Sequence, residues 1–320
     1  MTTLKNMIDE VAMNLSGYTL TQDRTTHLVS AVTTTTSSSA SPLVLSVDSS
    51  DNLSKGIVEI DEELLWINLT DRVSNTATIA PYGRGYLGTD PATHIADSKV
   101  TISPTFPRFT IKRAINDTIR AVGSSIFAAK TTTITSNAAV AAFRLPTTGA
   151  SLDARSILSI AYQTIGASKE WLPIRSWRLD GNANTTAFDS GQTISVYDNI
   201  PSGRTIQIVY SKEPTPFTTV IDATYTTLTA INDQVFTTIT GLPESCKDLI
   251  ILGSTYRLLS NLDPARAGMV SPQADEIDSK RPYGSSSSLT KQVYSLFNQR
   301  LNEEIKSQQD KYPIRIHYSL

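Results

Sequence analysis

The sequence has one cysteine, few charged residues and no long apolar run. A single cysteine, Cys246, excludes an intramolecular disulfide and any cysteine-rich zinc site, and its apolar helical surroundings indicate a buried, inert thiol. Apolar runs such as 249–252 are far shorter than the roughly 20 residues that cross a bilayer. The first residues lack the apolar stretch of a signal peptide. We therefore expect a soluble protein that is made in the cytosol and has no membrane partner.

Basic residues are not in excess either. The chain has 28 Lys and Arg against 30 Asp and Glu, a formal net charge of −2, and charged residues make up 18% of it. A protein that grips nucleic acid by its phosphates needs a basic face. The composition therefore argues against stable DNA binding but allows DNA to pass without specific contacts.

Apolar residues follow a helical period in four parts of the chain and alternate in two others. The helical parts are 3–16, about 108–126, 243–262 and about 287–311; strands are expected within 25–103 and 131–242, including one over Val235–Ile239. We predict an α+β fold, in which a helical bundle of N-terminal, central and two C-terminal helices carries two β-rich inserted domains and an extended C-terminal arm.

The predicted domain boundaries follow these patterns. The helical core is assigned 1–24, 104–130 and 243–312, the small β module 25–103, the β-sandwich-like domain 131–242 and the arm 313–320. At 320 residues the chain is long enough for each part to bury a core without a metal or disulfide.

The last predicted helix has an apolar side that we expect to be buried, in the core or against another subunit. Its members are Leu289, Val293, Leu296, Phe297, Leu301 and Ile305. Charged residues occupy the opposite side. Pro313 ends this helix.

The residues after Pro313 alternate strictly between apolar and polar. Ile314, Ile316, Tyr318 and Leu320 would face one way, and Arg315 and His317 the other. A free apolar strand at a chain end adds either to its own sheet or to a sheet in another chain. We favour the second alternative because the segment follows a long helix and is distant in sequence from both β-rich parts.

Two motifs carry possible chemistry. Gly83–Gly88 matches G-x-G-x-x-G, but Pro91 follows and no βαβ pattern surrounds it, so we predict a turn-forming loop rather than a nucleotide site. In Asp61-Glu62-Glu63, the first and third side chains can share one side and the second cannot, and we predict a solvated hairpin turn.

No catalytic arrangement accompanies the three histidines, which are His27, His94 and His317. We therefore expect a protein that is not an enzyme and that holds no cofactor and no metal.

The hairpin at 57–67, I-V-E-I-D-E-E-L-L-W-I, and the loop at 83–94, G-R-G-x-x-G-T-x-x-A-x-H, close on Lys99–Ile102. This combination resembles a small β module of structural proteins in tailed bacteriophages, although Asp97 or Ser98 stands where a glycine is usual. The order of helices, β-rich inserts and C-terminal arm resembles the head–tail connector, or adaptor, proteins of these phages.

The resemblance implies a structural virion protein at the head–tail junction, assembled in the host bacterial cytoplasm. It implies a homo-oligomeric ring of twelve subunits stacked on the portal protein, with the C-terminal arm reaching onto the portal. DNA would pass through the lumen during genome ejection, and a stopper or tail protein would dock below. The alternative is a tail, baseplate or receptor-binding structural protein.

Overall fold

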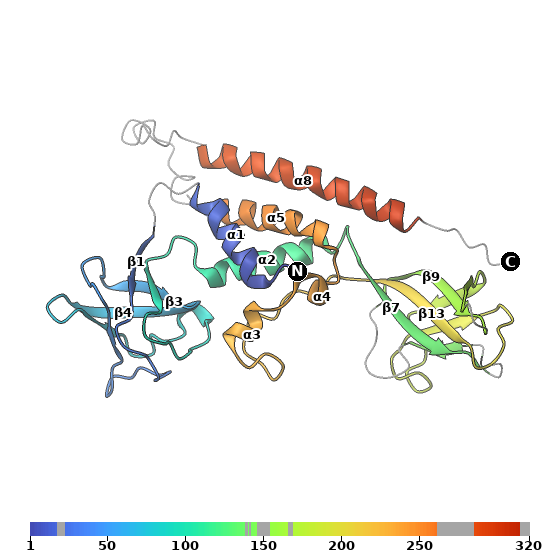
Figure 1. Cartoon of the computed structure of the whole chain (residues 1–320), viewed down its shortest axis with the longest axis horizontal. Helices are drawn as coiled ribbons and strands as arrows, with labels where there is room; N and C mark the ends of the chain where they lie inside the picture. The colour runs from blue at the N-terminus through green and yellow to red at the C-terminus, as the bar shows by residue number, and fades with distance from the viewer. Residues whose placement is uncertain are drawn as a thin grey trace. The chain divides into compact units, whose positions relative to one another are not determined.

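The chain divides into two compact units in a computed structural model that describes residues 1–17, 23–137, 140, 142–145, 154–165, 169–260 and 285–313 (Figure 1). Unit 1 holds residues 1–118, 217–235 and 247–297. Unit 2 holds residues 119–216, 236–246 and 298–320. Each unit combines strands with helices.

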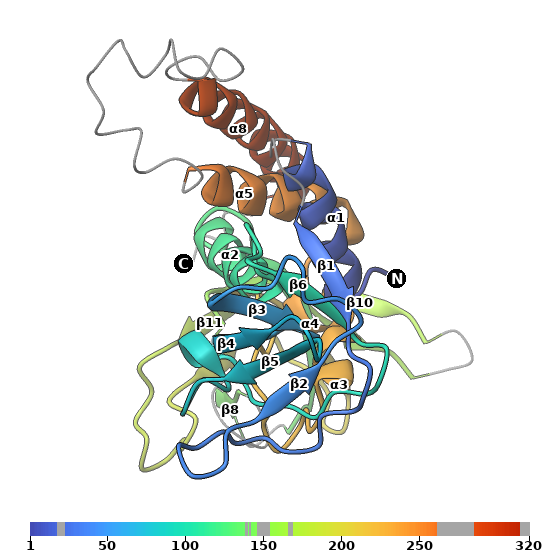
Figure 2. The same cartoon turned by 90° about the vertical axis from the view of Figure 1, so that its left-hand side faces the viewer.

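Unit 1 contains a six-stranded antiparallel sheet whose spatial order differs from the chain order. Its strands are β1 (Arg24–His27), β2 (Val44–Ser46), β3 (Gly56–Ile60), β4 (Glu63–Asp71), β5 (Thr76–Ile79) and β6 (Lys99–Ile102), arranged β1-β6-β3-β4-β5-β2. A bridge between Leu28 and Val47 joins the ends of the two edge strands. The sheet, seen in Figure 2, therefore curves round an apolar core that includes Val58, Leu65 and Ile79.

The helices of unit 1 are amphipathic. They are α1 (Leu4–Ser16), α3 (Leu228–Asn232), α5 (Lys247–Leu259), the part of α2 (Arg108–Val122) up to Thr118 and the part of α8 (Ser285–Lys311) up to Phe297. The Thr3 hydroxyl caps α1 by accepting from the N–H of Asn6 at 3.3 Å. Helix α1 buries its apolar stripe and contacts α5 (Figure 1). These positions confirm the helical period expected for residues 3–16.

Two antiparallel sheets make up most of unit 2. Their strands are β7 (Ala128–Thr135), β8 (Ala142–Arg144), β9 (Ser156–Gln163), β10 (Trp171–Pro173), β11 (Trp177–Asp180), β12 (Thr193–Val196) and β13 (Thr205–Lys212), in the orders β10-β9-β13-β7 and β11-β12-β8. Ile160 and Ile206 of the first sheet share one core with Ile194 and Val196 of the second. The two sheets therefore face each other across apolar side chains.

Helix α8 (Ser285–Lys311) runs for 27 residues, close to the range expected from the sequence. Its residues from Asn298 onward belong to unit 2. There the guanidinium of Arg300 lies 2.7 Å from Glu304 Oε1 and donates to the carbonyl of Ser245 at 3.0 Å. Ser245 is in the short 3-10 turn η2 (Glu244–Cys246). The ion pair lies within α8, and the hydrogen bond to Ser245 joins the second half of α8 to η2.

The strand predicted over Val235–Ile239 is wrong, because Phe236–Thr240 forms the short helix α4. Phe236 and Thr240, one helical turn apart, are both buried. The Thr240 hydroxyl donates to the carbonyl of Phe236 at 2.8 Å. Tertiary burial at helical spacing has overridden the strand preference of β-branched residues.

The predicted fold class is also wrong: the protein is not a helical bundle that carries inserted β domains. It is β-rich: strands make up 27% and helices 30% of the described residues, and the six described α-helices do not form a separate body. The boundary between the units falls inside α2 and inside α8. Periodicity revealed the helices but not what their apolar stripes pack against, and the sheets bury cores of their own. The domain boundaries drawn from the sequence stay a prediction.

Candidate functional site

The hairpin between β3 and β4 turns at Asp61 and Glu62, whose φ angles are both positive, 50° and 88°. Glycine or asparagine is usual at such positions, because a side chain there costs on the order of 1–3 kcal/mol. The strands stay paired up to Ile60 and Glu63. The strained turn therefore depends on side-chain contacts, and it has them on both sides.

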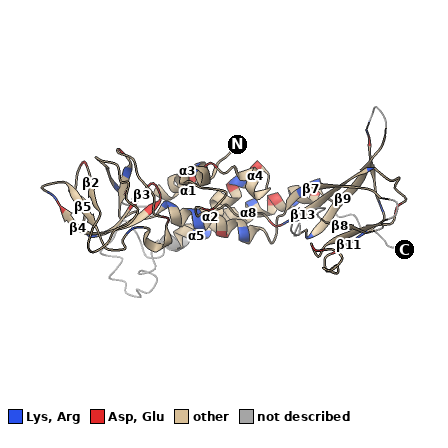
Figure 3. Cartoon of the chain, turned by 90° about the horizontal axis from the view of Figure 1, so that it is seen from below, with Lys and Arg blue, Asp and Glu red and all other residues tan. Residues whose placement is uncertain are grey.

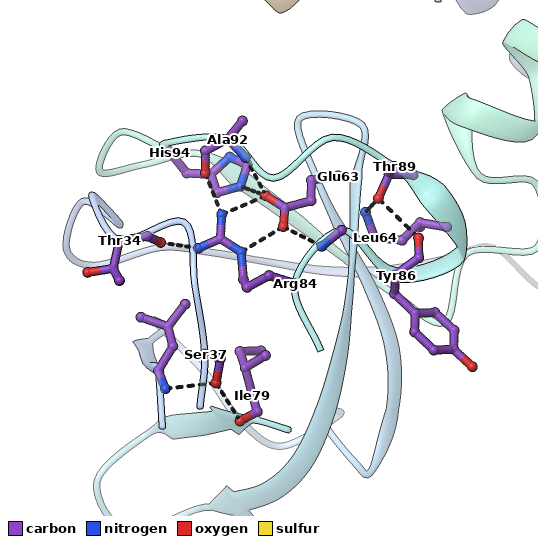
Figure 4. A network of polar contacts seen from close by, with 12 residues as sticks. Thr34, Ser37, Glu63, Leu64, Ile79, Arg84, Tyr86, Thr89, Ala92 and His94 are labelled. Atoms are coloured by element: carbon purple, nitrogen blue, oxygen red, sulfur yellow. Dashed lines mark hydrogen bonds and ion pairs between the residues drawn. The ribbon is translucent and has the colours of Figure 1, made fainter. Parts of the chain in front are cut away.

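Glu63 is the centre of a buried charge cluster on one side of the turn (Figure 4). Arg84 contacts both carboxylate oxygens, with Nε 2.6 Å from Oε1 and Nη2 2.7 Å from Oε2. The backbone N–H groups of Gly85 and Ala92 donate to the same carboxylate, each at 2.9 Å. The guanidinium also donates to the carbonyls of Thr34 and Ala92. Arg84 thus ties two loops to strand β4.

His94 joins this cluster to the turn. Its Nε2 lies 2.9 Å from Glu63 Oε2, and its Nδ1 lies 3.0 Å from Asp61 Oδ2. Burial acts to lower the pKa of His94, but its hydrogen bonds with Asp61 and Glu63 outweigh that effect and raise it. Asp61 and Glu63 therefore share one side of the hairpin, as the alternation predicts.

The same contacts control the ionisation of both carboxyl groups. The hydrogen bond with His94 lowers the pKa of Asp61 despite partial burial. Burial acts to raise the pKa of Glu63, yet hydrogen bonds from Arg84, His94, Ala92 and Gly85 lower it to about 2. Glu63 therefore stays ionised inside the module.

Glu62 points the other way and contacts helix α2. Its carboxylate accepts from Lys112 Nζ, lies 3.4 Å from Arg108 Nε and accepts from Asn232 Nδ2 at 3.0 Å. Only 6% of Glu62 and 1% of Glu63 are exposed. The predicted hairpin turn is present and Asp61 is exposed, but Glu62 and Glu63 are not solvated as predicted, because they have buried partners that are distant in the sequence.

Glu59 lies on β3 close to this second group of charges. Its Oε1 accepts from the backbone N–H of Arg108 at 2.7 Å, at the start of α2. Burial raises the pKa of Glu59 from 4.5 to about 7, against the smaller opposing effect of Arg108. Glu59 thus favours the neutral form below pH 7.

Replacing Glu59 with glutamine should stabilise the protein at pH 8 and leave it nearly unchanged at pH 4. Because the folded state holds the proton up to about pH 7 and the unfolded state only to about 4.5, the stability of the natural chain falls as the pH rises through that range. The shift corresponds to on the order of 3 kcal/mol. Thermal unfolding at both pH values measures it. The exposed Glu170→Gln variant is the control, and a loss of stability at pH 8 in Glu59→Gln would contradict the assignment.

The glycine-rich loop between β5 and β6 is built for close packing. Gly85 has φ 60°, and a Cβ there would lie 2.7 Å from the carbonyl oxygen of Thr89. At Gly83 a Cβ would lie 2.9 Å from the carbonyl oxygen of Trp66 on β4. Residues 83–98 are all described, and their only helical segment is the 3-10 turn η1 (Tyr86–Gly88). The predicted turn-forming loop is confirmed.

The contacts of this arrangement suit a structural role, in which the cluster joins the β3–β4 hairpin to neighbouring loops. Glu63, Arg84 and His94 are buried, and both Arg84 and His94 are hydrogen-bonded to Glu63, so the cluster locks the hairpin to the loops around it. In the described ranges, no group of three His, Cys, Asp or Glu side chains could hold a metal ion. Burial, together with Glu304, raises the pKa of the Cys246 thiol to about 12, so the thiol stays protonated.

Helix α8 divides its predicted apolar residues between buried and exposed positions. Val293 and Phe297 are buried, whereas 37% of Leu289 and 48% of Leu296 are exposed. Leu301 and Ile305 are partly buried. The predicted arm residues Ile314, Arg315, Ile316, His317, Tyr318 and Leu320 lie outside the described residues.

A comparison with known protein families finds a match that covers most of the chain. The family model for the SU10 adaptor protein matches residues 87–315, more than half of the chain. The chain belongs to this family. The match confirms the resemblance to the head–tail adaptors of tailed bacteriophages, so the protein is a structural adaptor of the phage virion. No curated protein matches the chain.

The matched part of the adaptor takes in α2, both sheets of unit 2 and α8. The β3–β4 hairpin lies before it. None of the helices that the structure describes combines the length and the apolar character needed to cross a bilayer.

Sequence reasoning missed the cations of the adaptor's buried clusters. Lys112 falls outside the apolar stripe of α2 and would therefore be expected to be exposed, yet only 2% of it is exposed. Arg84 lies inside the G-x-G-x-x-G motif, which predicts only a turn. The available signal was the acidic run at 61–63 within apolar strands, because buried carboxylates require cationic or N–H partners.

Proposed function

We propose that this adaptor forms a homo-oligomeric ring of twelve subunits beneath the portal protein. DNA passes through the lumen of the ring, and a stopper or tail protein docks on the side away from the portal. The observation that carries the proposal is the family match over residues 87–315. The adaptor acts as a passive connecting part of the virion, assembled in the host cytoplasm.

Helix α8 supplies the surface best suited to the contact between subunits. Leu289 and Leu296 are seven residues apart, two helical turns, and so lie on one face of the helix. Both are exposed, while Val293 and Phe297 occupy the neighbouring stripe that packs within the chain. A closed ring needs contacts between two different faces of each subunit, and stable contacts bury more than about 1,000 Å². We assign Leu289 and Leu296 to one of these faces.

The C-terminal segment supplies the contact with the portal. Its apolar residues Ile314, Ile316, Tyr318 and Leu320 alternate with Arg315 and His317. Such a segment can add to a sheet edge in the portal through its backbone while the apolar side chains enter pockets.

The charge distribution supports free passage of DNA. The net charge is −2, and Figure 3 shows the positions of basic and acidic residues interspersed along the helices rather than gathered on one element. A lumen without a continuous basic surface does not trap phosphates.

Removing residues 314–320 should abolish binding to the portal without unfolding the adaptor. The full chain should sediment with purified portal rings, and electron micrographs of the mixture should show a twelve-fold ring on the portal. The truncated chain should stay soluble, keep its circular dichroism spectrum and remain in the supernatant. Unchanged co-sedimentation of the truncated chain would contradict the role of the segment, and a virion map with the adaptor away from the head–tail junction would overturn the proposal.

A further inference from the structure

A groove of about 440 Å³ lies at the carboxyl end of α8 within unit 2. Its apolar wall comprises Phe127, Ile157, Leu158, Trp177, Ile305, Tyr312 and Pro313. Ile157 belongs to the core between the two sheets, and Trp177 packs against that core. Apolar side chains that enter the groove would therefore extend an existing core.

Contacts at Phe127 fix the end of α8 beside this groove. The side chain of Gln308 accepts from the Phe127 N–H at 3.2 Å and donates to the Phe127 carbonyl at 2.5 Å. The ring centroids of Phe127 and Tyr312 are 5.9 Å apart. Pro313 lines the groove. Residues 314–320 are therefore attached to the chain at Pro313, in the wall of the groove.

The next seven residues match the groove in chemistry. In an extended segment, Ile314, Ile316, Tyr318 and Leu320 share one face. Exposing this apolar face to water is unfavourable. Because the segment is tethered at Pro313, its local concentration at the groove reaches the millimolar range, well above that of a second copy in dilute solution.

We propose that residues 314–320 of the free adaptor bind in the groove of their own chain, with the apolar side chains turned inward. The groove then covers the segment until another partner displaces it. Where that partner is the portal, a consequence that rests on the proposed function, the portal competes with the groove for the same side chains. The free adaptor thereby keeps its binding segment from pairing with other sheet edges.

Trp177 allows a direct test without the portal. The chain has three tryptophans, and Trp177 is the one that remains in a Trp66→Phe, Trp171→Phe background. Ending this chain at Pro313 should shift the Trp177 emission to longer wavelength, and adding a synthetic peptide of residues 314–320 should reverse the shift saturably. A peptide carrying the Ile314→Asp and Ile316→Asp changes should not reverse it.

Several outcomes would overturn the inference. Emission that is unchanged by truncation, or reversal by both peptides alike, would show that the groove does not hold the segment. A truncation-sensitive signal that grows with protein concentration, together with dimers, would show exchange between copies. Hydrogen exchange on the natural chain provides a second measurement: amides of residues 156–158 should exchange faster after truncation, and equal exchange would contradict the proposal. If the adaptor shows the Trp177 shift but does not bind the portal, the proposed function is refuted and the inference about the groove is not.

Discussion

Replacing Arg84 with methionine is expected to destabilise unit 1 by about 3–5 kcal/mol. The substitution leaves the Glu63 carboxylate buried without its cation, since the two side chains are only 2% and 0% exposed. The carbonyls of Thr34 and Ala92 also lose their donor. A buried charge whose partner is removed costs far more than an exposed pair contributes, so the effect is large although methionine fills much of the volume.

Chemical unfolding at pH 7 measures this loss, and an exposed ion pair provides the matched control. Arg144→Met removes the partner of Asp189, whose side chain is 75% exposed, and should cost less than about 1 kcal/mol. Adding Glu63→Gln to Arg84→Met should recover part of the stability, because the carboxamide removes the unpaired buried charge. A loss below about 1 kcal/mol for Arg84→Met would show that the cluster does not hold the module together.

The β3–β4 hairpin shows what alternation in the sequence can and cannot predict. Alternation along the strand correctly placed Asp61 and Glu63 on one side, where His94 bridges them. It could not show that Glu62 meets Lys112 and Asn232, which lie 50 and 170 residues further along the chain. Local rules give the direction of a side chain, whereas its partner depends on how distant segments pack.

The same limit explains the errors in the fold. The apolar period gave the position of α8 closely, and the sequence order of elements gave the adaptor family. The period could not separate Phe297, which packs within the chain, from Leu296, which is exposed. Both are apolar and adjacent, and only the packing of the helix decides between them. The same apolar pattern therefore includes residues that pack within the chain and residues that are exposed.

Phe297→Ala should cost about 3–5 kcal/mol, the second large effect expected in this protein. Only 7% of Phe297 is exposed, and its ring lies 5.4 Å from that of Tyr256 and 6.3 Å from that of Tyr294. A Cβ on Gly253 of α5 would lie 2.9 Å from the Phe297 ring and 2.3 Å from Thr118 on α2. The aromatic ring therefore occupies a place where the absence of a side chain on α5 allows three helices to approach, and alanine leaves a cavity that they cannot readily close.

Leu296→Ala is the matched control, because it shortens the adjacent side chain on the same helix at a position that is 48% exposed. Thermal and urea unfolding should place it within about 0.5 kcal/mol of the natural chain. If Leu296 contacts the next subunit, the same variant should form rings on the portal less readily while its melting temperature is unchanged. Phe297→Ala should show the opposite result: it should lower the stability of the free protein, and any effect on ring formation should follow from that loss. A melting temperature of Phe297→Ala within a degree or two of the natural chain would show that this face of α8 is not packed in the free protein, and the division of α8 into an internal stripe and an assembly stripe would then be wrong.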